Sequence, residues 1–116
     1  MDIKIKRIYE NAADTDGYRI LVDRLWPRGI SKEKAKVDKW EKDIAPSPAL
    51  RKVYHAGQIE FEEFKKRYID ELKNNDALPA FLKELREKGE VTFLYALKDK
   101  EKNHALLLKE YIDKSK

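Results

Sequence analysis

The sequence contains no cysteine, which excludes disulfide bonds, thiolate catalysis and cysteine-based zinc or iron–sulfur sites. Histidine is scarce, and its two positions, His55 and His104, are too far apart in sequence to suggest a metal site. A magnesium site needs only one or two carboxylates plus a substrate phosphate, so that possibility stays open. No apolar run approaches the roughly 20 residues that span a bilayer, and residues 1–6 alternate apolar and charged side chains, unlike a signal peptide. We therefore expect a cytoplasmic protein with no membrane partner.

Charged side chains are abundant, at 41% of the chain against the roughly 25% that is usual. Most of them are Lys and Glu on predicted helix faces, which is typical of a surface covered by ion pairs. The net charge of +4 is compatible with an anionic partner, but 22 acidic residues are interspersed with the basic ones, so it is weak support for nucleic acid. The 116 residues predict one domain over 1–116.

Hydrophobic periodicity predicts a small α/β domain with three layers, in which helices cover a mainly parallel sheet of about three strands. Strands are expected at residues 3–8, 18–23 and 91–96, the first of them at an edge because one of its faces is charged. Helices are expected at 31–35, from Pro48, at 59–73, from 75 or 76 to Gly89, and from 101 or 103 to 112. The long helical crossover between the second and third strands favours a parallel pair. The direction of the first strand stays open, because the loop after it also permits a hairpin.

Arginine is concentrated at one place in the chain. Seven arginines occur against nineteen lysines, yet Arg19, Arg24 and Arg28 fall within ten residues of one another, around the end of the second strand. Lys98 follows the third strand, and ligands of open α/β sheets bind at the carboxyl ends of the strands. The guanidinium group makes two parallel hydrogen bonds to phosphate or carboxylate. We therefore expect Arg19, Arg24, Arg28 and Lys98 to bind an anion near a helix N-terminus.

Two further residues are candidates for proton transfer. Asp23 directly follows the apolar run 20–22, and His104 lies near the start of the last helix. Asp23 can also serve as a metal ligand, and each residue has a structural alternative: Asp23 can orient an arginine, and His104 can cap or pack.

Other residues near the predicted site also have structural interpretations. Arg24 can form an ion pair with Asp23 or Glu41, and Trp26 and Trp40 are expected to pack rather than to stack on bases. His55 is expected to be an ordinary loop residue.

The string Leu21-Val22-Asp23-Arg24-Leu25-Trp26-Pro27-Arg28-Gly29-Ile30-Ser31-Lys32 resembles the signature of the domain of unknown function 488 family, in its short YeaO-like branch. Trp40, residues 44–47, Leu50-Arg51, residues 94–99 and residues 103–105 resemble its later blocks, so the likeness covers nearly the whole chain. The resemblance implies a small three-layer α/β domain from a bacterial or archaeal cytosol, and it implies no established activity. Longer relatives carry a cysteine-containing block after the last strand, where this chain has Tyr95 to Lys98, so no cysteine chemistry carries over.

Three functions remain open from the residues. The first is binding of a small phosphate-bearing or other anionic ligand, with or without a reaction, in which the arginines hold the anion and Asp23 or His104 handles a proton. The second is a nucleic-acid-binding module, and the third is a protein-interaction domain with a purely structural Arg/Asp network. No motif identifies a cofactor, and the oligomeric state cannot be read from the sequence.

Overall fold

A computed structural model describes residues 1–115. Its centre is a four-stranded, entirely parallel sheet in the order β1-β4-β2-β3. The strands are β1 (Asp2–Arg7), β2 (Tyr18–Leu21), β3 (Lys39–Trp40) and β4 (Glu90–Tyr95). The predicted α/β class is confirmed, with one strand more than expected: the two-residue β3 extends the sheet beside β2, pairing Ile20 with Lys39 and Leu21 with Trp40.

The open direction of the first strand is settled by its partner. β1 pairs with β4 in parallel, from Asp2 beside Glu90 to Arg7 beside Tyr95, and it forms one edge of the sheet as predicted. β2 is parallel to β4 on the other side, as the long crossover between them requires. The segments that leave β2 and β4 therefore emerge at the same edge of the sheet.

The helices begin and end close to where their capping residues predict. They are α1 (Lys32–Ala35), α2 (Pro48–His55), α3 (Phe61–Lys73), α4 (Leu78–Lys88) and α5 (His104–Lys114), with short 3-10 turns η1 (Asp14–Asp16) and η2 (Lys42–Ile44). Ser31, Ser47 and Asn103 each cap a helix by accepting a hydrogen bond from a backbone N–H of its first turn. Gly89 ends α4 with a positive φ of 78°, a conformation that glycine adopts without steric cost.

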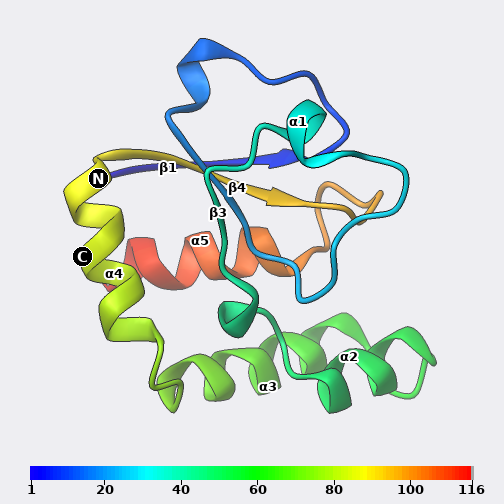
Figure 1. The fold of residues 1–116 in the computed structure, drawn as a ribbon. Helices are drawn as coiled ribbons and strands as arrows, with labels where there is room; N and C mark the ends of the chain where they lie inside the picture. Colours follow the sequence, from blue (N-terminus) through cyan, green and yellow to red (C-terminus); the bar gives the residue numbers. More distant parts are fainter. Residues whose placement is uncertain (116) are drawn as a thin grey trace.

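The two faces of the sheet are covered unequally (Figure 1). On one face α5 lies against β1 and β4, with α3 beyond it and α2 against α3. This side holds the main core, in which Tyr68 and Phe93 are fully buried. On the other face a smaller cluster around Leu21 and Leu94 is covered by α1 and by Trp26 and Trp40. Among the described residues, none of the helices combines the length and apolar character that crossing a membrane requires.

Candidate functional site

A cleft of about 470 Å³ lies where β2 and β4 end, and we call it the strand-end cleft. Its walls come from the segment after β2, the segment before α2, the second half of α2, the segment after β4 and the start of α5. Five of the six residues singled out from the sequence line it: Asp23, Arg24, Arg28, Lys98 and His104. Parallel pairing explains this, because it carries residues 23–28 and 96–104 to one edge of the sheet.

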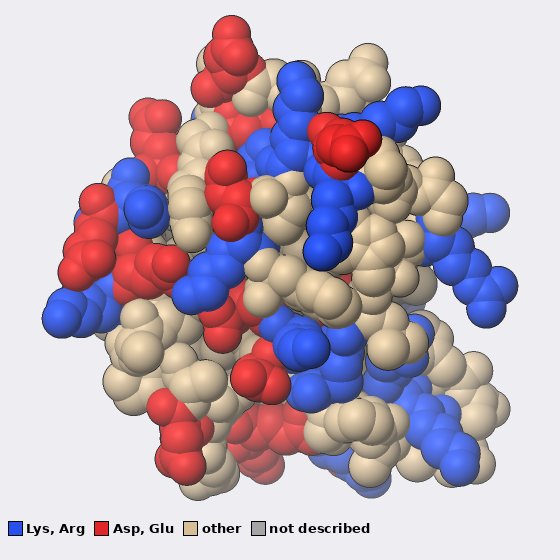
Figure 2. Space-filling model, viewed as in Figure 1, with Lys and Arg blue, Asp and Glu red and all other residues tan. Residues whose placement is uncertain are grey.

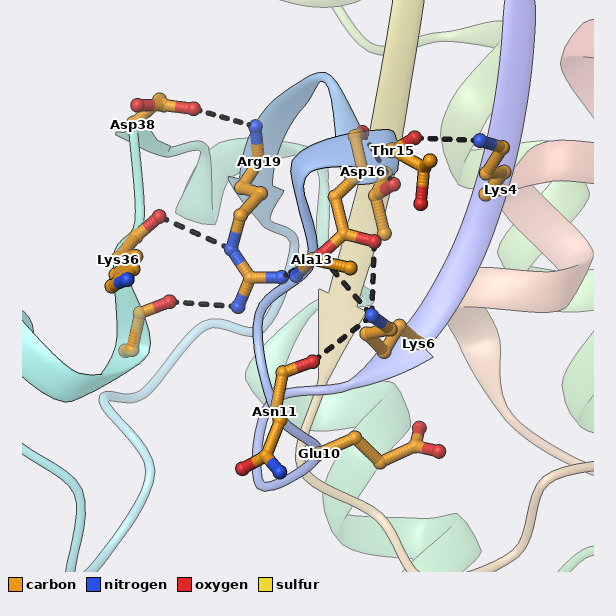
Figure 3. Close-up of polar contacts among 12 residues, drawn as sticks. Lys4, Lys6, Glu10, Asn11, Ala13, Thr15, Asp16, Arg19, Lys36 and Asp38 are labelled. Atoms are coloured by element: carbon orange, nitrogen blue, oxygen red, sulfur yellow. Dashed lines mark hydrogen bonds and ion pairs between the residues drawn. The ribbon is translucent and has the colours of Figure 1, made fainter.

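Arg19 lies elsewhere, inside β2, and its side chain is only 5% exposed. Its guanidinium group forms an ion pair with Asp16 and donates hydrogen bonds to the carbonyl oxygens of Ala35, at 2.7 Å, and Lys36, at 3.2 Å (Figure 3). Its backbone N–H donates to the Asp38 carboxylate at 2.8 Å. Arg19 therefore connects η1, β2 and the end of α1, and it does not line the strand-end cleft.

Asp16 is the centre of this buried network (Figure 3). Burial alone would raise the pKa of its carboxyl group, but hydrogen bonds from the Ala13 N–H, Lys6 and Arg19 outweigh that effect and hold the pKa below its usual value. Lys6 approaches the two carboxylate oxygens at 2.9 and 3.1 Å. Among the predicted site arginines, Arg19 is thus the one that belongs to a structural Arg/Asp network.

Asp23 and His104 tie the ends of the two strands together. One Asp23 carboxylate oxygen, Oδ2, accepts a hydrogen bond from the Ala96 N–H at 3.0 Å. His104 Nε2 lies 2.9 Å from the Val22 carbonyl oxygen and 3.2 Å from Asp23 Oδ1. Because a carbonyl only accepts, Nε2 carries a proton directed at Val22. Asp23 Oδ1 is buried and accepts no hydrogen bond within residues 1–115, so the His104 imidazole is the polar group that faces it.

Arg24 reaches across the cleft floor to the chain that leads into α2. Its Nε and one terminal nitrogen donate to the carbonyl oxygens of Pro46, at 3.2 Å, and Ala45, at 3.1 Å. The ion pairs considered from the sequence do not form, because Glu41 is paired with Lys39 and Asp23 faces His104. Two carbonyls therefore orient the guanidinium group without neutralising its charge.

The loop after β2 is fixed by side-chain hydrogen bonds to its backbone. The Tyr9 hydroxyl donates to the Arg28 carbonyl at 2.7 Å, and the Trp40 indole N–H donates to the Asp23 carbonyl at 2.7 Å. The Trp26 indole N–H donates to the Ile30 carbonyl at 2.8 Å. The two indole rings lie edge to face with centroids 5.6 Å apart, so the prediction that both tryptophans pack is confirmed.

The lining residues that were not expected at the site include Arg51, Tyr54, His55 and Lys102. Arg51, Tyr54 and His55 stand on α2, and His55 is the last residue of that helix rather than part of a loop. Burial, followed by the positive charges of Arg51 and His104, lowers the pKa of His55. The helix itself was predicted from Pro48, and the match of Leu50-Arg51 to a later block of the family pattern was the signal that could have drawn attention to Arg51.

The lining is strongly biased toward positive charge. Five lysines and arginines, Arg24, Arg28, Arg51, Lys98 and Lys102, line the cleft against the single carboxylate of Asp23. Figure 2 shows Lys and Arg mixed with Asp and Glu over much of one face. Toward the right of that view, which is the side where β1 and β4 end in Figure 1, the charged side chains that can be seen are Lys and Arg. Within residues 1–115, no three His, Asp or Glu side chains gather in a way that could hold a metal ion. The positively charged lining therefore favours the binding of an anion.

Comparison with known proteins places the chain among uncharacterised relatives. It matches the family described as the inactive DUF488-N3 subclade over residues 2–116. It is 42% identical to the uncharacterised protein YeaO of Escherichia coli K12 over 112 residues, covering 97% of each chain. It is 40% identical over 111 residues to the uncharacterised protein Rv3073c of Mycobacterium tuberculosis H37Rv, covering 96% of this chain and 93% of that one. No solved structure matches. The chain therefore belongs to the domain of unknown function 488 family, in its YeaO-like branch, as the arginine-rich signature indicates.

Proposed function

We propose that the strand-end cleft binds a small phosphate-bearing ligand and does not convert it. The observation that carries the proposal is the charge of the lining, five Lys or Arg side chains against one carboxylate, in a cleft of about 470 Å³. This volume lies within the roughly 300–1,000 Å³ that is usual for small-molecule sites. A ligand with two negative charges would meet several cations together, and each charge-assisted hydrogen bond contributes about 1.5–3 kcal/mol.

Pre-organisation supports binding at Arg24. Its guanidinium group is held by two backbone carbonyls, so little side-chain entropy is lost when an anion arrives. The carbonyls leave its positive charge intact, unlike the Asp16 carboxylate beside Arg19.

Binding without conversion is supported by the state of the two proton-transfer candidates. Asp23 accepts from the Ala96 N–H and faces His104, while the proton on His104 Nε2 is directed at Val22. The Asp23 Oδ2 and His104 Nε2 atoms are therefore engaged with backbone groups at the ends of β2 and β4. The family description, an inactive subclade, agrees with this role.

Two observations favour a small ligand over nucleic acid. The Trp26 and Trp40 rings pack on each other and their N–H groups bind backbone carbonyls, which takes them away from base stacking. Acidic side chains are also interspersed with basic ones over much of the face that Figure 2 shows.

The test uses isothermal titration calorimetry with inorganic phosphate and with adenosine monophosphate (AMP). Arg28→Gln and Arg51→Gln are suitable variants because both side chains are exposed and, within residues 1–115, neither donates a hydrogen bond to the protein. Each is expected to lower affinity roughly tenfold, the factor that corresponds to about 1.4 kcal/mol. Arg86→Gln removes the same charge from an exposed position on α4 and should leave affinity unchanged.

Several results would count against the proposal. Equal losses in all three variants would mean that only overall charge matters. Absence of any phosphate or AMP binding at low salt would refute the site. If AMP were recovered chemically altered after incubation, as monitored by ³¹P NMR, the enzyme hypothesis would replace simple binding.

A further inference from the structure

The strand-end cleft continues into a second, more open hollow, which we call the outer hollow. Five residues line both spaces and so form their junction: Tyr54, His55, Leu97, Lys98 and Lys102. Five others line the outer hollow alone: Gly57, Ile59, Glu60, Phe61 and Asp99. The two spaces therefore form one groove that runs from the strand ends past the end of α2 to the start of α3.

Charge changes sign along this groove. The cleft contributes Arg24, Arg28 and Arg51, and the junction contributes Lys98 and Lys102. The outer hollow's own lining has no Lys or Arg and has two carboxylates, on Glu60 and Asp99. Hydrogen bonds from the Lys102 and Glu101 N–H groups lower the pKa of Asp99, so it is negatively charged at neutral pH. A phosphate is thus attracted to the inner end of the groove and repelled from the outer end.

An aromatic wall accompanies the change in charge. Phe64 lines the cleft, Tyr54 lines both spaces and Phe61 lines the outer hollow. The Tyr54 and Phe64 rings are stacked with centroids 4.4 Å apart, and the Phe61 ring lies 6.2 Å from each of them. Leu97, 37% exposed, lines both spaces and adds apolar surface at the junction. The outer end therefore offers an apolar, aromatic surface with hydrogen-bond acceptors beside it, suited to an uncharged ring with hydroxyl or amino groups.

We propose that the groove binds a nucleoside phosphate in one orientation, with its phosphate at the arginines of the strand-end cleft and its sugar and base in the outer hollow. This inference rests on the proposed binding of a phosphate and adds the class of ligand and its direction. The base lies against Tyr54, Phe61 and Leu97. The carboxylates of Glu60 and Asp99 accept hydrogen bonds from the sugar hydroxyls or the base.

The experiment compares inorganic phosphate, ribose 5-phosphate and AMP by calorimetry on the full chain. AMP is expected to bind about tenfold more tightly than inorganic phosphate, since stacking of one base on an aromatic side chain typically strengthens binding by roughly fivefold to a hundredfold. Phe61→Leu and Leu97→Ser are expected to remove most of that advantage, measured as the ratio of the AMP affinity to the inorganic phosphate affinity. Leu97 is an exposed loop residue, so its variant remains informative even if Phe61→Leu disturbs α3.

Leu25→Ser is the matched control, because Leu25 is 59% exposed and lines the cleft but not the outer hollow. Because Leu25 lies at the phosphate end alone, its variant should keep the ratio of the AMP affinity to the inorganic phosphate affinity at the wild-type value. A fall in that ratio in Leu25→Ser, with none in the Phe61 and Leu97 variants, would overturn the proposed orientation. Equal affinity for phosphate, ribose 5-phosphate and AMP would overturn the nucleoside assignment while leaving phosphate binding intact. Tight binding of a single-stranded oligonucleotide without binding of AMP would overturn it in favour of nucleic acid.

Discussion

Substitution of Arg19 by methionine tests whether this arginine is structural rather than part of the ligand site. Methionine keeps a long, flexible apolar side chain but removes the charge and all donors. The Asp16 carboxylate would lose one of its two cationic partners, and the Ala35 and Lys36 carbonyls would each lose a hydrogen bond. Because Arg19 is 5% exposed, water cannot easily replace these contacts.

The size of the effect follows from the burial of the pair. Breaking a buried ion pair by removing one partner typically costs about 3–5 kcal/mol. Lys6 and the Ala13 N–H still bind Asp16 in the variant, so we expect the lower end, about 3 kcal/mol. At roughly 4 °C per kcal/mol for a domain of this size, the midpoint of thermal unfolding should fall by about 12 °C.

The assay is urea unfolding followed by circular dichroism, with phosphate calorimetry on the same samples at a temperature where the variant is folded. We expect the free energy of unfolding to fall and phosphate affinity to stay at the wild-type value. A change in stability below 0.5 kcal/mol, a small surface effect in size, would refute the structural role. Loss of phosphate binding by the folded variant would return Arg19 to the ligand site.

Asp16 gives the same network a dependence on pH. Its pKa is lower in the folded chain than the usual value, so its stabilising contribution is present above about pH 4 and is lost as the pH falls further. Between pH 5 and pH 3 the wild type should therefore lose more stability than Asp16→Asn, measured by urea unfolding at each pH. Identical losses in the two proteins would show that the Asp16 carboxyl is not held ionised by the fold.

Three further outcomes follow from single contacts. Gly17→Ala should destabilise the fold by more than about 2 kcal/mol, because its φ of 66° is positive and the new Cβ would collide with a backbone carbonyl of β4. Gly57→Ala is the control: its Cβ would meet open space, so it should cost only the roughly 1–2 kcal/mol of the left-handed backbone conformation. Tyr68→Phe should lower the free energy of unfolding in urea by about 1–2 kcal/mol, since it removes the hydroxyl that donates to the Ile44 carbonyl at 2.7 Å. An unchanged free energy of unfolding would mean that water replaces the hydroxyl. Burial and nearby positive charge lower the pKa of His55, whereas a bound anion favours its protonated form. Calorimetry should therefore show that sulfate affinity rises as the pH falls from 8 to 5, and that it rises less in His55→Gln. Equal rises in the two proteins would exclude His55 from the site.

The sequence predicted the elements whose signals are local. Ser31, Ser47 and Asn103 cap helices through their own side chains, and the apolar runs in β2 and β4 are long enough to recognise. The short strand β3 was missed because two residues, Lys39 and Trp40, carry no periodicity. The direction of β1 was open for a related reason: its partner is β4, about 90 residues away in the chain, and not its sequence neighbour β2.

The arginines show where composition misleads and where topology helps. Arg19, Arg24 and Arg28 form one cluster in the sequence, but Arg19 lies between Tyr18 and Ile20 inside a strand, whereas the other two follow the strand's end. Ligands of open α/β sheets bind at the carboxyl ends of the strands, so the predicted strand 18–23 would already have separated Arg19 from Arg24 and Arg28.

The side chains that reach the cleft from other elements are a different case. Arg51 and His55 reach it only because α2 lies beside α3, and α3 in turn packs on α5. That packing depends on contacts such as the Tyr68 hydroxyl with the Ile44 carbonyl, 24 residues apart. A site assembled from strand ends can thus be located from the sequence, but the helix side chains that complete its charge depend on tertiary packing, which local patterns do not encode.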